Sequence, residues 1–278
     1  MLGMLRGFYT AASGMLAQQR KTEMLANNMA NVNTPGFKAD QTSLRAFPEM
    51  LLKQIEGQPF PSQNGRTTYN SIGTLNTGVY LQEAMPLFQQ GSLKETTLST
   101  DVALLDINLP INPDTGRTGS VFFTVMNANG ETRYTRNGNF TLDSEGYLTT
   151  GSGMYVLDQE GNQIQLTSDQ FQISEDGYIT GANGETARLG IGYSDNPLAM
   201  VKEGDGLFRA DGELADAYTT ANVTFKMQQG FLEQSNVDSA QTMTEMMTAY
   251  RAFEANQKIL QAYDTSLQKT VNEVGRIG

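Results

Sequence analysis

Hydrophobic residues near the start of the chain recur at intervals of three and four positions. The positions that share this spacing are Leu5, Phe8, Ala12, Met15, Thr22, Ala26 and Met29, with Gln19 as a polar exception. Such spacing places one apolar stripe on an α-helix. Asn33-Thr34-Pro35-Gly36 then combines a turn-forming residue, a proline and a glycine, which together end a helix. The pattern predicts a helix over about residues 3–33, roughly 45 Å long.

The other end of the chain has a similar pattern. Asn236 or Asp238 can cap a helix, and no glycine or proline occurs between Phe231 and Val274. Two series of positions, each spaced seven residues apart, interleave so that successive positions lie four and three residues apart. The wholly apolar series is Met246, Phe253, Leu260, Leu267 and Val274. The other series contains Gln257 and Asp264, which weaken a simple dimeric zipper. We expect a helix of about 40 residues, or roughly 60 Å.

The middle of the chain is typical of β structure. Short strand-like runs occur at residues 122–125, 133–135, 139–142 and 147–149. Turn signals separate them at Asn129-Gly130, Asn137-Gly138, Glu145-Gly146, Glu160-Gly161, Asp176-Gly177 and Asn183-Gly184. Residues 140–149 are echoed by residues 171–180, which predicts a repeated hairpin within one antiparallel sheet system. The loops at Asp143–Gly146 and Glu175–Gly177 are interpreted as hairpin turns, because they lack the spaced ligands of a calcium loop.

These patterns predict an α+β fold in three parts. Residues 1–36 and 231–278 form a helical assembly core, in which the two long helices pair as a coiled-coil-like stalk. Residues 98–230 form a central antiparallel β domain. Residues 37–97 form an irregular, extended arm. Within that arm, the apolar residues of segment 44–55 predict a short amphipathic helix, and segment 57–73 a loop or extended arm.

Composition narrows the range of functions. The 278 residues contain no Trp, Cys or His, which excludes a disulfide framework, a thiolate metal site, a cysteine nucleophile and a histidine base. The net charge is −11 and no basic stripe is present, so nucleic-acid binding is disfavoured. Ser–Lys pairs, paired carboxylates and all-oxygen metal sites remain possible, so composition only disfavours enzyme activity.

The N-terminal segment lacks the continuous apolar run of a secretory signal, and no stretch reaches the length of a membrane span. If the protein leaves the cytoplasm, we expect export without a cleaved signal peptide.

The two apolar stripes at opposite ends of the chain favour self-assembly. Two helices that packed only on each other would leave much of both stripes in water. Packing against further copies would bury this surface, at about 25 cal/mol per Å². A head-to-tail interface that does not close generates a helical filament or tube.

Five motifs occur in order along the chain. They are Leu25–Lys38 (LANNMANVNTPGFK), Gln90–Leu93 followed by Asp101–Ala103, Tyr134–Phe140 followed by Gly146–Leu148, Gly230–Asp238, and Ala249–Lys258. Together they resemble the signatures of flagellar rod and hook proteins. The nearest resemblance is to the distal rod group (FlgG and FlgF) and its Gram-positive rod–hook counterparts, the FlhO and FlhP type. Segment Asp106–Ser120 departs from the family pattern, so its strands are not predicted.

The resemblance implies a structural subunit of the bacterial flagellar rod or rod–hook junction, located in the basal body. It implies a helical tube that transmits motor torque, with the terminal helices inside and the β domains outside. Implied partners are other copies, adjacent rod or hook subunits and the flagellar type III export apparatus. The resemblance also implies no enzyme activity, no catalytic, cofactor-binding or metal-binding residues, no cofactor and no small-molecule substrate. Two alternatives stay open: a transient rod or hook cap or other assembly accessory, and a cell-wall hydrolase fused to a rod-like framework.

The residues expected to carry self-assembly combine the two stripes with the Asn-rich motif. They are Leu5, Phe8, Met15, Leu25, Asn27, Asn28, Asn31, Asn33, Pro35, Gly36, Phe37, Val237, Met246, Tyr250, Phe253, Asn256, Leu260 and Leu267. The asparagines have two interpretations. They form either a solvated helix face ending in a cap, or a set of amides that hydrogen-bond to neighbouring helices or backbone in the assembled tube.

Overall fold

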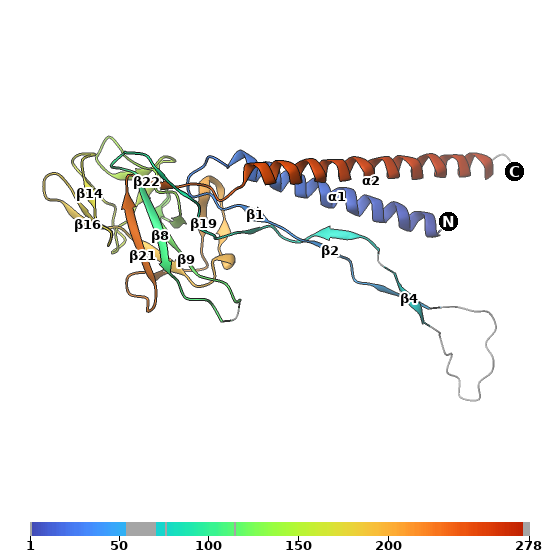
Figure 1. Ribbon diagram of the computed structural model, residues 1–278, viewed down its shortest axis with the longest axis horizontal. Coiled ribbons are helices and arrows are strands. Elements are labelled where there is room, and N and C mark those ends of the chain that lie inside the picture. Colours follow the sequence, from blue (N-terminus) through green and yellow to red (C-terminus); the bar gives the residue numbers. More distant parts are fainter. Residues whose placement is uncertain (1, 54–70, 76, 114, 275–278) are drawn as a thin grey trace, which may run out of the picture. The chain divides into compact units, whose positions relative to one another are not determined.

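The computed structural model describes residues 2–53, 71–75, 77–113 and 115–274 (Figure 1). The chain forms two compact units. One contains residues 1–27, 41–84 and 240–278, and the other contains residues 28–40 and 85–239. The first unit holds nearly all of both long helices, and the second is rich in antiparallel strands. The α+β prediction is confirmed.

Two helices dominate the first unit. Helix α1 (Leu2–Ala30) has 29 residues and helix α2 (Ser239–Val274) has 36. They lie side by side and antiparallel (Figure 1). A methyl group on Gly7 would meet the Tyr263 ring, one on Gly14 would meet Asn256, and the Lys21 Nζ lies 3.6 Å from a Glu245 carboxylate oxygen. α1 ends slightly before the expected position, because residues 31–36 already form turns.

A two-stranded arm completes this unit. Strand β2 (Leu44–Ala46) pairs with β5 (Val79–Leu81), and β3 (Met50–Lys53) pairs with β4 (Ser71–Leu75), both antiparallel. The expected short helix over residues 44–55 is therefore wrong. Its backbone groups bond to two strands, about 35 and about 20 residues later, and a local hydrophobic pattern cannot show such partners. Residues 54–70, which include most of the predicted 57–73 loop, lie outside the described residues.

The second unit is built around a nine-stranded sheet. Its main path runs β11-β12-β13-β9-β10-β19-β18, and β17 pairs with β9 and β20. These strands are β9 (Ser120–Met126), β10 (Thr132–Thr135), β11 (Phe140–Leu142), β12 (Leu148–Thr150), β13 (Tyr155–Val156), β17 (Ile191–Ser194), β18 (Val201–Lys202), β19 (Leu207–Arg209) and β20 (Ala215–Asp216). Strand β9 is buried on both faces. Phe123 packs in the main core, whereas Phe122 joins a second cluster with Phe208.

Smaller sheets surround the nine-stranded sheet. A three-stranded sheet contains β14 (Gln172–Ile173), β15 (Tyr178–Thr180) and β16 (Thr186–Arg188). Strand β8 (Val102–Asn108) pairs with β21 (Thr224–Gln229), and β7 (Leu93–Glu95) pairs with β22 (Phe231–Glu233). The remaining short elements are β1 (Asp40–Gln41), β6 (Met85–Pro86) and the 3-10 turns η1 (Pro197–Ala199) and η2 (Gly204–Gly206).

The repeated hairpin is confirmed, but not as part of one sheet. β11 and β12 belong to the nine-stranded sheet, whereas β14 and β15 form the three-stranded sheet. Both predicted turns are present, and their glycines Gly146 and Gly177 each have a φ of 82°. In the first turn the Asp143 Oδ1 accepts the backbone N–H groups of Glu145 and Tyr147, each at 2.9 Å. That bonding is the ordinary role of an aspartate in a turn.

The segment that departs from the family pattern forms a small excursion between β8 and β9. The Gly119 N–H donates to the Pro110 carbonyl at 3.1 Å, and the Asn112 N–H donates to the Arg117 carbonyl at 2.8 Å. Ile111 and Thr118 form an antiparallel bridge. The inserted residues therefore pair with one another and leave β9 in place as the central strand.

Candidate self-assembly site

Four of the five sequence motifs meet at one buried ionic cluster in the β-rich unit. Lys38, Arg136 and Glu233 are each at most 2% exposed. The Lys38 Nζ lies 2.6 Å from the Glu233 Oε1, which also accepts the Gly91 N–H at 2.9 Å. The Arg136 Nε donates to the Glu233 Oε2 at 2.9 Å. The cluster therefore joins segments that are far apart in the sequence.

The charges of this cluster balance. Arg136 also forms an ion pair with Asp106, at 2.9 Å, so two cations face two carboxylates. Remaining donors bond to backbone: the Lys38 Nζ reaches the Gln89 carbonyl at 2.9 Å, and Arg136 reaches the Val121 carbonyl at 2.8 Å. A buried ionic group is tolerated when it is paired and its hydrogen bonds are satisfied.

Burial shifts the pKa values of the cluster. Loss of solvent, together with repulsion from Arg136, lowers the pKa of Lys38 to about 8 despite the attraction of Glu233. Burial alone would raise the pKa of Glu233, but the charges of Arg136 and Lys38 outweigh it and hold that pKa below its ordinary value. Both groups are therefore ionised at neutral pH. The ion pairs of the cluster hold these segments together, and the cluster does not act as an acid or base.

Gly36 lets the Asn-rich motif approach the rest of this unit closely. Its φ is +69°, and a methyl group there would lie 2.5 Å from the Arg136 carbonyl carbon. The Gly36 N–H donates to the Glu233 carbonyl at 2.8 Å. The next residue, Phe37, is buried, and the Lys202 Nζ lies 4.0 Å from its ring centroid. Any side chain at position 36 would separate these segments.

The asparagines predicted for self-assembly separate into different environments. Asn28 is buried and exchanges two hydrogen bonds with the backbone of Asp40, at 2.8 and 2.9 Å. Asn31 is half-buried and accepts the Thr34 hydroxyl at 3.2 Å. Asn27 and Asn33 are exposed. Asn28 therefore has partners within its own chain, which neither interpretation of the sequence included.

The remaining predicted residues vary in burial. Leu25, Gly36 and Phe37 are buried, whereas Tyr250 is exposed. The half-buried residues are Phe8, Met15, Pro35, Val237, Met246, Phe253, Asn256, Leu260 and Leu267. The side chain of Leu5 lies outside the described ones. On α2 the described side chains of the apolar series (Met246, Phe253, Leu260 and Leu267) are thus half-buried, and the series with Gln257 and Asp264 is exposed.

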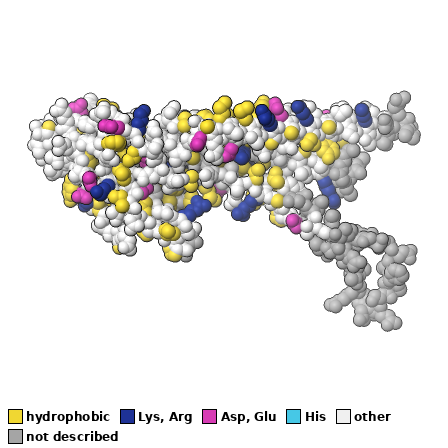
Figure 2. Space-filling view, in the orientation of Figure 1, with side chains coloured by type: hydrophobic (Ala, Val, Ile, Leu, Met, Phe, Trp, Pro, Cys, Tyr) yellow, Lys and Arg dark blue, Asp and Glu magenta, His cyan; other side chains and the backbone are white. Residues whose placement is uncertain are grey.

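Small residues make the closest helix contacts, and the hydrophobic pattern missed them. Ala11 and Ala17 on α1 and Ala249 on α2 are buried, and Gly7 and Gly14 lie directly against α2. A search for small residues at helical spacing would have found Gly7, Ala11 and Gly14. Large apolar residues instead reach the surface: Tyr9, Leu16, Met243, Met247, Tyr250, Ile259 and Val271. Figure 2 shows hydrophobic side chains spread among charged ones along the helices.

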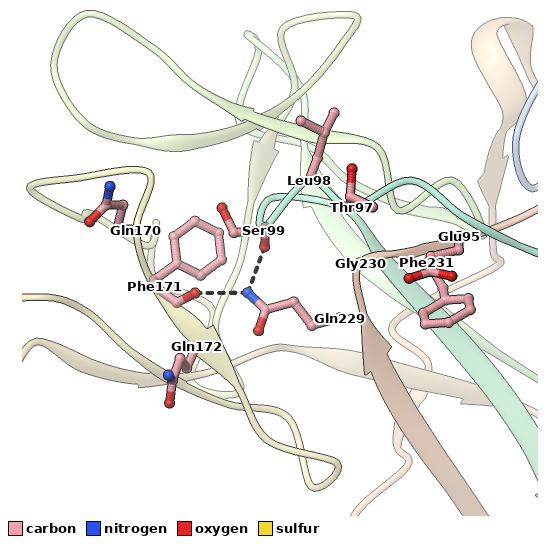
Figure 3. A pocket seen from close by; sticks show the side chains of 10 residues that line it. All are labelled: Glu95, Thr97, Leu98, Ser99, Gln170, Phe171, Gln172, Gln229, Gly230 and Phe231. Carbon is pink, nitrogen blue, oxygen red and sulfur yellow. Dashed lines mark hydrogen bonds between the residues drawn. The ribbon is translucent and has the colours of Figure 1, made fainter.

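A groove of about 570 Å³ lies on the β-rich unit (Figure 3). Its lining includes Glu95, Leu98, Phe171 and Gln229. The Gln229 amide bridges two loops, donating to the carbonyls of Ser99 and Phe171 at 2.6 and 2.8 Å. Glu95 is the one ionisable residue in the lining, so the groove offers no pair of groups for acid–base chemistry.

Among the described residues no three His, Cys, Asp or Glu side chains gather in a metal-binding arrangement. No helix in the described ranges combines the length and apolar character that crossing a bilayer demands.

Three segments match known families. Residues 8–38 match the flagella basal body rod protein family, residues 118–181 the flagellar hook protein FlgE/F/G D1 domain, and residues 228–273 the flagellar basal body rod FlgEFG protein C-terminal family. The chain is 45% identical to the flagellar hook-basal body complex protein FlhO of Bacillus subtilis, over 99% of this chain and 100% of the relative. It is 34% identical to the basal-body rod protein FlgG of Bacillus subtilis, over 97% and 99%. For FlgG of Borreliella burgdorferi the identity is 32%, over 95% and 97%.

Proposed function

The chain belongs to the flagellar basal-body rod and hook protein family, and we propose that it self-assembles there, as a structural subunit, through its terminal helices. This family consists of structural proteins, and its members are located in the flagellar basal body. The observation that carries the self-assembly proposal is the surface of the helical unit. Small residues fill the contact between α1 and α2, while seven large apolar side chains are exposed on the described parts of these helices.

Exposed apolar side chains on a helix pair give assembly its free energy. Burying one Leu, Met or aromatic side chain completely stabilises by about 1.5–3 kcal/mol. Several such burials per copy offset the entropy lost when a subunit joins a polymer. The helix pairs would then pack as a coiled-coil-like stalk in the wall of a helical tube. The β-rich units would lie outside it, and the tube would transmit motor torque.

The predicted assembly residues have two different roles in this proposal. Leu25, Asn28, Gly36 and Phe37 hold the chain together where α1 ends. Tyr250 and the half-buried apolar residues of α1 and α2 contact other copies. In this proposal residues 1–36 and 231–278 act as the assembly core and residues 98–230 as the β domain, although residues 28–36 and 231–239 pack in the β-rich unit. Residues 37–97 form the arm.

The route to the basal body follows from the same resemblance. The protein would pass through the flagellar type III export apparatus without a cleaved signal peptide. It would add to adjacent rod or hook subunits, with no nucleic acid or small molecule as partner.

Electron microscopy of isolated basal bodies tests the proposal. An antibody against residues 120–200 is expected to label the rod or the rod–hook junction. Absence of label from mature basal bodies, with the protein secreted into the medium, would overturn it in favour of a displaced cap. A peptidoglycan zymogram checks the hydrolase alternative, and a cleared band from the pure protein would contradict a purely structural role.

A further inference from the structure

Two separate apolar surfaces lie on the helical unit. The first, the α1 stripe, consists of Tyr9 and Leu16, which are 65% and 48% exposed. The second, the α2 stripe, consists of Met243, Met247 and Tyr250, which are 54%, 48% and 55% exposed. Residues seven apart, or four and three apart, lie on one face of a helix. Each stripe is therefore a continuous apolar strip on its own helix.

A cavity adjoins the α2 stripe. It has a volume of about 260 Å³ and is lined by Thr22 of α1 and by Met246, Met247, Tyr250 and Arg251 of α2. Methionine side chains adapt their shape to a neighbour more readily than branched ones. The α1 stripe, by contrast, presents two projecting side chains. The cavity beside the α2 stripe therefore offers space for a side chain of the α1 stripe.

A single copy cannot bring its own two stripes together. Because Gly14 lies against Asn256 in the antiparallel pair, Leu16 is level with the part of α2 near residue 254. The α2 stripe lies about ten residues from that level at its far end, which is about 15 Å along the helix. The α2 stripe borders the helix contact, because Thr22 of α1 lines the cavity beside it, whereas Tyr9 and Leu16 of the α1 stripe are exposed. Their complementary partner must come from another molecule.

We infer that the α1 stripe of one copy docks on the α2 stripe of a second copy, with Leu16 and Tyr9 packing around the cavity beside Met247 and Tyr250. This inference rests on the proposed function as a self-assembling subunit, and it names the contact that joins one copy to the next. Two different surfaces at different heights make a heterologous interface. Such an interface leaves both outer stripes free for further copies, so it extends instead of closing into a dimer.

Charge supports this pairing over a contact between two identical helices. α1 carries Arg6, Arg20 and Lys21 against Glu23, whereas α2 carries four acidic and three basic residues. In a polymer whose copies all point the same way, α1 of one copy and α2 of the next are antiparallel. If Tyr9 then faces Tyr250, Leu16 faces Met243 and Arg6 is level with Phe253, one residue from Glu254. Arg6 and Glu254 are both exposed. Opposite charges at the rim favour this register and disfavour like-charged alternatives.

Disulfide cross-linking tests the contact, because the chain contains no cysteine. The full-length variant with Leu16→Cys and Met243→Cys is expressed in place of the wild type, and isolated basal bodies are oxidised and run on a non-reducing gel. We expect a ladder of dimers, trimers and longer species. The two positions are too far apart within one copy for an internal bond, which needs Cα atoms within about 7 Å. The matched control combines Leu16→Cys with Ile111→Cys, an exposed apolar position on the β-rich unit, and should give no ladder.

A charge reversal gives a second readout in the same background. Arg6→Glu should lower the ladder yield about three- to ten-fold, and adding Glu254→Arg should restore it. Antibody labelling of the same preparations distinguishes failure of the docking contact from failure of the proposed function. Labelled basal bodies without a ladder, or with dimers from Leu16→Cys alone, overturn the docking contact and leave the proposed function standing. Unlabelled basal bodies overturn the proposed function and this contact with it.

Discussion

Replacing Glu233 by Gln is expected to destabilise the β-rich unit strongly. The substitution keeps the size of the side chain but removes its charge. Glu233 accepts the Lys38 Nζ at 2.6 Å and the Gly91 N–H at 2.9 Å on one oxygen, and Arg136 at 2.9 Å on the other. A glutamine oxygen can replace only the first of these oxygens. Its NH₂ group would then face the Arg136 donors, so a charge-assisted bond becomes a donor–donor contact.

The magnitude follows from burial. In wild type two buried cations face two carboxylates, whereas the variant leaves Lys38 and Arg136 with Asp106 alone. Breaking a buried ion pair by removing one partner costs about 3–5 kcal/mol. For a unit of this size each kcal/mol lowers the midpoint of thermal unfolding by about 2–4 °C, so the midpoint should fall by about 6–20 °C.

Thermal unfolding followed by near-ultraviolet circular dichroism measures this change. The signal comes from buried tyrosines of the β-rich unit such as Tyr134 and Tyr193, since the chain has no tryptophan. Glu131→Gln is the matched control. Glu131 also pairs with an arginine at 2.9 Å, but its side chain is 56% exposed, so its midpoint should stay close to that of wild type. Equal shifts in the two variants would refute the claim that burial makes the Glu233 cluster important.

Three further outcomes follow from the structure. Gly36→Ala should lower the unfolding free energy by about 2–4 kcal/mol, because φ is +69° and the methyl group meets backbone; Gly130→Ala, with φ +80° and open space around it, should cost clearly less in the same urea titration. Lys38 has a pKa of about 8 in the folded protein and 10.5 unfolded, so between these values the unfolded chain binds more protons and the Lys38-dependent part of the unfolding free energy rises with pH by about 3 kcal/mol. A fall with pH, measured as the difference between wild type and Lys38→Met, would contradict this assignment. Limited proteolysis of the purified monomer should leave a resistant core of about residues 75–230 with sensitive ends, and full-length resistance in a verified monomer would count against ordering of the ends on assembly.

The parts of the fold that depend on local sequence were predictable. α2 was predicted within a few residues, because an apolar rhythm without glycine or proline defines a long helix whatever lies beside it. The hairpin turns at Gly146 and Gly177 were predicted for the same reason, since their φ values are a local property of the turn. The helix predicted over residues 44–55 failed because pairing with β4 and β5 outweighed local spacing.

The ionic cluster depended on long-range contacts and was missed. Lys38 and Glu233 are 195 residues apart, and Arg136 and Glu233 are 97 apart. Each of the three is a charged residue, and a hydrophobic pattern does not mark a charged residue as buried. The available signal was that these three motifs contain two basic residues, Lys38 and Arg136, and two acidic ones, Glu233 and Asp238. Their pairing needs the fold, because one sequence does not say which motifs meet.

The position of the cluster explains how helices from opposite ends of the chain come to run side by side. Lys38 follows the end of α1 by eight residues, and Glu233 precedes the start of α2 by six. Between them the Gly36 N–H bonds to the Glu233 carbonyl at 2.8 Å, and the Asn236 N–H bonds to the Phe37 carbonyl at 3.4 Å. The chain therefore leaves α1 and enters α2 at neighbouring points. Two helices that meet at one such point, one ending there and the other beginning there, are antiparallel wherever they lie together. The bonded segments at the end of α1 and the start of α2 thus set the direction of the two helices relative to each other, and the small residues Gly7, Ala11 and Gly14 set how closely they pack. In the proposed assembly, the large apolar residues contact other copies.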